Sequence, residues 1–251
     1  MEGFGEKIAE VMSSNKIDIH LFGLTIQISD AVIVMWIIMA FLIIFSIIFT
    51  RKMKTIPEGK QNIVETLVEL INKLTEGSVG HHWKLFAPYI GTVLLFLVLS
   101  NTISIFNIIP SGEQLYHLTH IKAFQKFPDF NLIPPTKNAS VAMGFAVMSM
   151  VAVLISGIRV KKVSGWLKSF LEPVPLLLPF KILDYVIRPL SLCFRQYGNV
   201  LGAVIIMELI YSSIPAFIPG VVSIYFDIFD GILQAYVFVF LTSLYIAEAV
   251  E

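Results

Sequence analysis

Long uncharged apolar runs, separated by short basic segments, fill the first two thirds of the chain. No charged side chain lies in residues 31–50, 85–110 or 139–158. An α-helix rises 1.5 Å per residue, so about twenty such residues cross the ~30 Å hydrocarbon core of a bilayer. The pattern therefore predicts three membrane-spanning helices. The second run contains Ser-Asn-Thr at 100–102, whose polar groups need helix or protein partners in lipid.

Two further segments have amphipathic patterns. Apolar residues alternate between 17 and 29 around Phe22 and Gly23, which is typical of a short β-hairpin. Between residues 56 and 77 the apolar side chains share one helical face, and they are Ile63, Leu67, Leu70, Ile71 and Leu74. This second segment is too polar to span, and it predicts a helix lying on the membrane surface.

The last third combines nearly continuous apolar sequence with embedded charges. Ordinary membrane-anchoring helices avoid such charges, which here are Lys181, Asp184, Arg188, Arg195, Glu208, Asp227, Asp230 and Glu248. Pro215 and Pro219 interrupt the apolar sequence, so two long helices are expected at about 180–213 and 221–250. Each is longer than a perpendicular crossing requires, and we expect both to be strongly tilted.

These elements predict an all-α integral membrane protein with about five membrane-crossing helices and one interfacial amphipathic helix. The composition agrees, because 56% of the 251 residues are hydrophobic and only 14% are charged, unlike soluble domains. The expected segments begin with an external N-terminal part (1–30), a first span (31–50) and a cytoplasmic interfacial helix region (51–84). Two spans (85–158), joined by an external loop (111–138), follow. The rest is a cytoplasmic loop and a helical hairpin with embedded charges (159–251).

Basic residues predict how the chain is oriented in the membrane. Clusters follow the first and the third span, and they comprise Arg51, Lys52, Lys54, Arg159, Lys161 and Lys162. Positively charged loops stay on the cytoplasmic side, so we expect the N-terminus outside and the C-terminus inside. Residues 1–15 are polar and do not resemble a cleaved signal peptide.

Several classes of function are excluded or disfavoured by composition. The 18 basic and 18 acidic residues cancel, so no global charge points to nucleic acid. Cys193 is the only cysteine, which excludes an intrachain disulfide and a cysteine-based metal cluster. His81 and His82 stand beside Trp83 at a membrane boundary, where an interfacial position is favoured over a metal site. We therefore predict no metal and no cofactor.

Arg195, in the stretch Pro-Leu-Ser-Leu-Cys-Phe-Arg-Gln-Tyr-Gly-Asn-Val, is the candidate functional residue that stands out. An arginine at the centre of a membrane helix costs roughly 2.5 to 3.5 kcal/mol on insertion scales. Its helical neighbours three and four residues away include no carboxylate. Arg188, by contrast, can pair with Asp184 four residues earlier. A counter-charge for Arg195 must therefore come from another helix or another subunit.

Titratable groups are expected on both sides of Arg195. The predicted topology puts Glu208, Asp227 and Asp230 toward the outer side and Asp184 toward the cytoplasmic side. Carboxylates can pass protons, whereas an arginine keeps its own, so the pattern predicts two polar wells separated by a fixed positive charge. Simpler structural roles stay open for most of these residues: helix capping for Asp227 and Asp230, helix–helix bonding for Asn199 and Gln234, and an ion pair for Asp184.

Two motifs resemble subunit a of the F-type ATP synthase, in its bacterial form. They are PLSLCFRQYGN, ending at Asn199, and LQAYVFVFLTSLY, ending at Tyr245, and the order of the spans is also similar. The resemblance implies that Arg195 is the essential arginine facing a rotating ring, and it matches the family's asparagine to Asn199 and its glutamine to Gln234. Family members often carry a glutamate where this chain has Val204.

The resemblance further implies a non-catalytic stator subunit with two offset half-channels. Glu208, one turn after Val204, and Asp227 and Asp230 would then form the outer inlet, with Asp184 near the inner outlet. Arg195 would separate them, positioned by Gln234 and Asn199. The implied partners are the c-ring, the peripheral-stalk b subunits, other ATP synthase subunits and lipid, in a bacterial plasma membrane. The sequence leaves the ion open between H⁺ and Na⁺, and the competing interpretation is an independent secondary ion transporter that uses the buried carboxylates.

Overall fold

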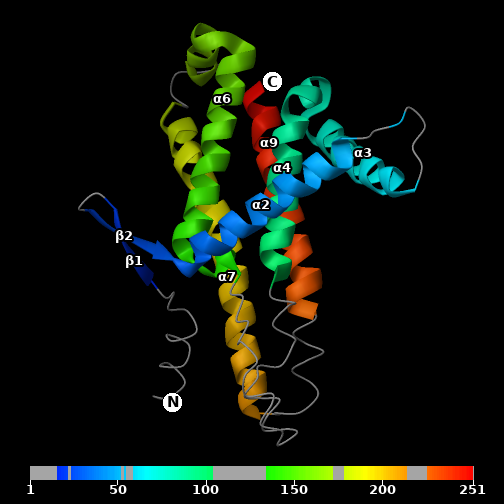
Figure 1. Ribbon diagram of the computed structural model, residues 1–251. Helices are drawn as coiled ribbons and strands as arrows, with labels where there is room; N and C mark the ends of the chain where they lie inside the picture. Colours follow the sequence, from blue (N-terminus) through cyan, green and yellow to red (C-terminus); the bar gives the residue numbers. More distant parts are fainter. Residues whose placement is uncertain are drawn as a thin grey trace, which may run out of the picture.

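Long helices form a bundle in the computed structural model, with a small β-hairpin at one side (Figure 1). The structure describes residues 16–21, 24–51, 54, 59–103, 134–171, 178–213 and 225–250. Helices α4, α6, α7 and α9 run along a common direction, and α2 crosses them obliquely. The C-terminus lies at the end of the bundle where α4 begins, and we call this end the C-terminal end.

The N-terminal part consists of the hairpin and α2. Strands β1 (Lys16–Leu21) and β2 (Leu24–Ser29) pair antiparallel, with Leu21 opposite Leu24. Helix α2 (Asp30–Thr50) follows directly, and the Ser29 hydroxyl accepts a hydrogen bond from the Ala31 amide at 3.4 Å. Most large side chains of α2 are exposed, as expected for a helix whose surroundings are lipid.

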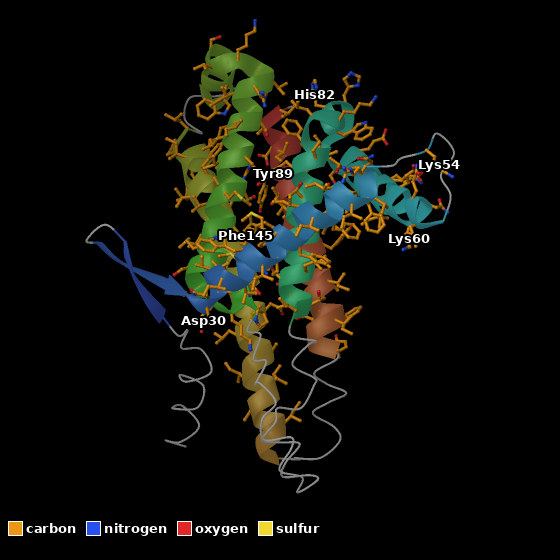
Figure 2. The ribbon with its side chains drawn as sticks, in the orientation of Figure 1. Asp30, Lys54, Lys60, His82, Tyr89 and Phe145 are labelled. Carbon is orange, nitrogen blue, oxygen red and sulfur yellow. The ribbon has the colours of Figure 1, made fainter. Side chains whose placement is uncertain are left out.

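Helices α3 (Lys60–Val79) and α4 (Trp83–Thr102) are joined by the short turn η1 (Gly80–His82). Gly80 has a φ of 68°, which favours glycine, and this residue ends α3. The two helices approach closely, because a Cβ on Gly91 would lie 3.0 Å from the Ile71 side chain. Only the later part of α3 is buried, at Ile71, Thr75 and Val79, and α3 contacts α4 and α9 near the C-terminal end marked by His82 in Figure 2. Ile63 and Leu70, on the predicted apolar face, are exposed.

Helix α6 (Ala139–Leu171) begins after the single turn η4 (Pro135–Lys137). The Asn138 side chain accepts a hydrogen bond from the Ser140 amide at 3.0 Å, an ordinary helix N-cap. Near its other end α6 kinks at Lys162, whose φ of 61° and ψ of 162° are not helical. The kink turns Trp166 back onto Gly157, where a Cβ would come within 2.9 Å of the indole ring.

Helix α7 (Leu178–Ser213) and helix α9 (Gly231–Val250) carry the charges of the last third, and α9 follows a π-helical turn, η6 (Tyr225–Asp230). The expected helix starting at 221 therefore differs from the structure in its described part, since regular α-helix begins only at Gly231. Residues 214–224 lie outside the described residues. The chain runs away from the C-terminal end along α7 and returns along α9.

The core lies where α4, α6 and α9 meet. Buried α6 residues are small and spaced by three or four positions, namely Ala142, Ala146, Ser149, Val153 and Ser156. Such a face lets helices approach closely in a membrane. Phe238 of α9 is 1% exposed and stands edge-on to Phe145, with 6.5 Å between the ring centroids. Figure 2 shows Phe145 in the middle of the bundle.

Among the residues that the structure describes, four helical stretches are long and apolar enough to cross a membrane, and they are Asp30–Thr50, Lys60–Thr102, Ala139–Trp166 and Ile228–Val250. In the second stretch α4 is the crossing helix, because α3 is amphipathic. The 36 residues of α7 give it a length of ~54 Å, more than enough for a fifth crossing. The expected class, an all-α integral membrane protein with about five crossing helices, is confirmed.

Candidate functional site

Helix α7 presents two different faces around Arg195. Phe194 and Arg195 are exposed, and Phe194 is 65% exposed. Leu192, Cys193 and Gln196 are buried against the bundle. Successive helix residues differ by about 100° in direction, so one turn of α7 accommodates both an outward arginine and an inward glutamine.

Arg195 has no counter-charge within the described part of the chain. No hydrogen bond, ion pair or ring contact joins it to another described residue. The sequence explains this isolation in part, because no acidic residue occurs on α9 between Asp230 and Glu248. The Arg195 side chain is therefore exposed at mid-helix, where none of the described residues supplies an interaction partner.

Behind Arg195, three buried amides form a chain of hydrogen bonds that links three helices. Gln234 Nε2 on α9 donates to Gln196 Oε1 on α7 at 3.3 Å. Gln196 Nε2 donates to Asn101 Oδ1 on α4 at 3.4 Å, and Asn101 Nδ2 donates to the Gly231 carbonyl at 2.9 Å. The three side chains are 0%, 6% and 7% exposed for Gln196, Gln234 and Asn101. We call this set the amide chain.

Toward the end of the bundle opposite the C-terminus, α7 and α9 are joined by a second polar contact. Asn199 Nδ2 donates to Asp230 Oδ2 at 2.6 Å. A hydrogen bond to an ionised acceptor is shorter and stronger than one between neutral groups. Asp230, the last residue of η6, is therefore held in place just before α9 begins. Asn199, which holds it, follows Arg195 by four residues on α7.

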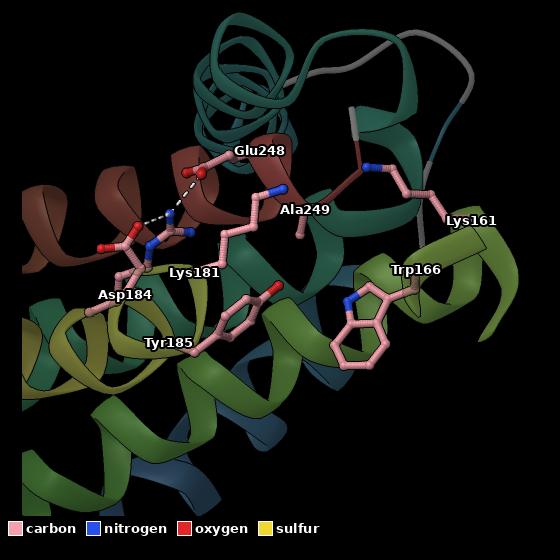
Figure 3. Close-up of a pocket in the computed structure, with 8 residues that line it drawn as sticks. Lys161, Trp166, Lys181, Asp184, Tyr185, Glu248 and Ala249 are labelled. Carbon is pink, nitrogen blue, oxygen red and sulfur yellow. Dashed lines mark hydrogen bonds and ion pairs between the residues drawn. The ribbon is translucent and has the colours of Figure 1, made fainter. Parts of the chain in front are cut away.

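At the C-terminal end, Arg188 forms a cluster of ionic and aromatic contacts. Its guanidinium lies 2.6 Å from Glu248 Oε1 and 4.0 Å from Asp184 Oδ2. It also stacks over Tyr245, 5.0 Å from the ring centroid. In Figure 3, dashed lines mark the contacts that Asp184 on α7 and Glu248 on α9 each make with the Arg188 guanidinium.

The Arg188 cluster lines a cavity of about 190 Å³ between α6, α7 and α9. Its lining residues are Lys161, Trp166, Lys181, Asp184, Tyr185, Arg188, Glu248 and Ala249. Both acidic and basic groups border it, so it offers a polar space at the C-terminal end. Asp184, one of the sequence candidates, lies on this cavity with its side chain 58% exposed.

The structure assigns the candidate amides partners other than Arg195. Sequence reasoning expected Gln234 and Asn199 to hold the arginine, but Gln234 reaches Gln196 and Asn199 reaches Asp230. The reason is directional, because Gln234 points from α9 toward Gln196 and Asn199 points toward Asp230, whereas Arg195 is exposed. Glu208 lies in α7 and Asp227 in η6, and their side chains lie outside the described residues.

Three contributors were not among the sequence candidates: Gln196, Asn101 and Glu248. A signal existed for Gln196, because Leu192, Gln196 and Val200 share one helical face and an amide within an apolar stripe needs a partner. The polar Ser-Asn-Thr sequence was expected to need partners, and Asn101 has them on α7 and α9. Glu248 was indistinguishable from a solvated tail charge.

Comparison with known proteins decides the family. The sequence model described as "ATP synthase A chain" matches residues 32–247, nearly the whole chain. The chain belongs to the ATP synthase A chain family. A relative named "ATP synthase subunit a, sodium ion specific", from Propionigenium modestum, is 29% identical over 219 residues, which cover 87% of this chain and 73% of the relative. The matched region includes the amide chain, Arg195 and Arg188.

Membership in the ATP synthase A chain family gives the chain its general role. It is a multi-pass membrane subunit of an ATP synthase, and it works with the other subunits of that complex. Its function is ion transport by the membrane-embedded stator, coupled to ATP synthesis. Among the described residues, the exposed arginine, the amide chain behind it and the polar contacts of Arg188 and Asn199 are candidates for this function.

Proposed function

We propose that Arg195 separates two offset ion half-channels that this chain supplies to a rotating c-ring of small carboxylate-bearing subunits. The observation that carries the proposal is the exposed position of Arg195 at mid-helix, with no partner among the described residues. A charge placed so expensively in a membrane is expected to have a functional partner. A carboxylate on a passing subunit supplies that partner and needs no fixed counter-charge on this chain.

The proposed mechanism uses the arginine as a stationary charge. A carboxylate that moves next to a guanidinium is favoured as the anion, so it releases its proton there. Arginine itself does not deprotonate in proteins, so it blocks a proton from running straight along the interface. Release on one side and uptake on the other then couple ion flow to rotation. The chain carries out no bond chemistry in this scheme and is a non-catalytic subunit.

The two half-channels are assigned to the two ends of the α7–α9 pair. Asp230, held by Asn199, would lie in the outer inlet together with Glu208 and Asp227. Asp184 and the cavity beside it would form the inner outlet. The basic residues near the C-terminal end support placing that end in the cytoplasm of a bacterial cell, with the N-terminus outside.

The decisive variant is Arg195→Ala in the assembled ATP synthase. We expect ATP-driven ion pumping by inverted membrane vesicles to be abolished, while the complex still assembles. Arg188→Lys is the matched control, because it alters an arginine on the same helix that already has partners, and it should keep most of the pumping. Normal pumping by Arg195→Ala would refute the proposal.

A second experiment separates the stator from an independent transporter. A cysteine introduced at Phe194, beside Arg195, should cross-link to a small carboxylate-bearing membrane subunit that copurifies with this chain. The purified chain alone in liposomes should then carry no ion flux. Flux by the chain alone, without its ring, would favour a secondary transporter that uses its own carboxylates.

Protons are the proposed coupling ion, and Na⁺ is the alternative because the Propionigenium modestum relative is named sodium ion specific. Vesicles prepared without Na⁺ should acidify on ATP addition, and a protonophore should collapse the gradient. A strict requirement for Na⁺, with uptake of Na⁺ that resists the protonophore, would replace H⁺ by Na⁺ in the same stator.

A further inference from the structure

We infer that Gln196 is a positioning residue that fixes the direction in which Arg195 points, by bonding to Asn101 on one helix and Gln234 on another. This inference rests on the proposed function, since it assumes that the outward direction of Arg195 matters. The side chain of Gln196 bonds to Asn101 and Gln234 and forms no hydrogen bond with Arg195. Its effect is exerted through the rotation of α7 about its own axis.

The geometry ties the two neighbours together. Adjacent residues of an α-helix point about 100° apart, so fixing one side chain against the bundle fixes the direction of the next. Gln196 is fully buried, whereas Arg195 is exposed. Rotating α7 toward the bundle would carry Arg195 inward and would break both amide bonds of Gln196 in the same movement.

The amide chain is arranged so that rotation of α7 is costly. Gln196 uses its carbonyl oxygen to accept from Gln234 and its amide nitrogen to donate to Asn101. A buried polar group that loses its partner incurs a desolvation penalty, which is larger in lipid because water cannot replace the lost bond. A leucine at this position would pack against the bundle without such directional preference.

The partners of Gln196 are themselves held in place. Asn101 donates to the carbonyl of Gly231 at 2.9 Å. The backbone of α9 comes very near at this point, because a Cβ on Gly231 would lie 3.1 Å from the Asn101 Cβ. Gln234 stands one turn further along the same helix. The chain thus starts and ends on α9, and both anchors of Gln196 belong to one tightly packed pair of helices.

Another buried polar contact offers a comparison within the same molecule. Ser149 and Thr242 join α6 to α9 through their hydroxyls at 2.8 Å. Thr242 also donates to the Phe238 carbonyl, so its hydroxyl has an intrahelical partner too. Neither residue adjoins an outward-facing charge. Ser149→Ala therefore removes a buried interhelical bond of similar kind without affecting the direction of Arg195.

The first measurement is ATP-driven pumping per assembled complex. Gln196→Leu should lower the initial rate about tenfold, which corresponds to ~1.4 kcal/mol in activation free energy. Ser149→Ala should keep the wild-type rate within a factor of about two. If Gln196→Leu assembles poorly, Asn101→Ala breaks the same chain from α4 and should give the same loss per assembled complex. Wild-type rates for both Gln196→Leu and Asn101→Ala would overturn the inference.

The second measurement reports direction and would not respond to a general loss of packing. Cys193 is replaced by Ser, and single cysteines are placed at Phe194 on the exposed side and at Tyr197, which packs against the core. With Gln196 present, only the cysteine at position 194 should cross-link to the ring subunit. In Gln196→Leu the yield at 194 should fall and that at 197 should rise.

The cross-linking outcomes distinguish a failure of the positioning role of Gln196 from a failure of the proposed function. An unchanged cross-linking pattern in Gln196→Leu, whatever its pumping rate, would refute the positioning role and leave the ring proposal intact. Failure of position 194 to cross-link with Gln196 present would instead contradict the proposed function. A further check is the variant that combines Gln196→Leu with Gln234→Leu, which should pump no worse than Gln196→Leu alone, because both act through one unit.

Discussion

Arg188 and Arg195 lie two turns apart on α7 and differ in nearly every contact they make. Arg188 has two carboxylates and two tyrosine rings around it, and its side chain is 16% exposed. Arg195 is exposed and has none of these among the described residues. Seven residues amount to about 700° of helical rotation, so the two arginines face within ~20° of each other. The direction in which each arginine leaves α7 therefore does not explain why their contacts differ.

The neighbouring helix explains the difference. Because α9 runs antiparallel to α7, its last turn, with Tyr245 and Glu248, stands beside Arg188. Its first turn stands near Asn199, where Asp230 accepts a hydrogen bond. Between these ends α9 has no acidic residue, so α9 offers no carboxylate to Arg195. Arg188 thus has its counter-charges within this chain, whereas Arg195 has none among the described residues, and the proposed function depends on this difference.

The largest expected effect comes from giving Arg195 the partner that Arg188 has. Ser191 is exposed and precedes Arg195 by four residues, the same spacing as between Asp184 and Arg188. Ser191→Asp should pair with Arg195 on its own helix and reduce ATP-driven pumping by about a hundredfold or more. The measurement is the initial pumping rate of inverted vesicles at equal amounts of assembled complex.

Ser191→Asn is the matched control for this test. It has nearly the same size and no charge, so it should pump within about twofold of the wild type. If Ser191→Asp assembles and pumps as well as Ser191→Asn, then isolation of Arg195 is not required for function. In that case the different contacts of Arg188 and Arg195 would have no consequence for pumping.

The next effect concerns stability rather than pumping. Arg188→Gln removes the ion pair to Glu248 and the contact with the Tyr245 ring. Since Glu248 is 63% exposed, the pair is worth only modest stability, and with the ring contact the loss should be about 1 kcal/mol. Heating the detergent-solubilised complex should show earlier loss of this subunit. Pumping at low temperature should persist, and its abolition would show that Arg188 also has a functional role.

Sequence reasoning predicted the crossing helices, and it predicted that Arg195 lacks a carboxylate partner on its own helix. Both predictions depend on local properties of the sequence. Uncharged runs of twenty residues identify spans, and an arginine without a carboxylate one turn away is visible in the sequence. The partners of Gln234 and Asn199 could not be obtained in this way. They depend on the register between α7 and α9, which the sequence leaves free and which depends on the core that Leu192 of α7 and Phe238 of α9 both join.

A smaller effect is expected at the far end of the α7–α9 pair. Asn199→Ala removes the hydrogen bond that holds Asp230 but leaves Arg195 and the amide chain unchanged. Pumping should fall about threefold to tenfold, as expected for loss of one charge-assisted hydrogen bond at a supporting site. Asn199→Gln keeps a donor and should recover part of the rate. A loss as complete as that of Arg195→Ala would instead place Asn199 in direct contact with the moving charge.

The smallest effect should come from the ion pair on α3, which lies outside the crossing helices. Lys73 Nζ is 2.9 Å from Glu69 Oε1, and this hydrogen bond and charge lower the pKa of Glu69 and raise that of Lys73. With the Glu69 pKa lowered in the folded chain, any stabilisation is present above its usual value near 4.3 and fades as the pH falls through the lowered pKa. Both side chains are mostly exposed, so water and salt screen the pair. Glu69→Gln should therefore leave both heat resistance and pumping at wild-type levels at pH 7, in contrast to Arg188→Gln, and a clear loss in either would show that α3 contacts another subunit through this face.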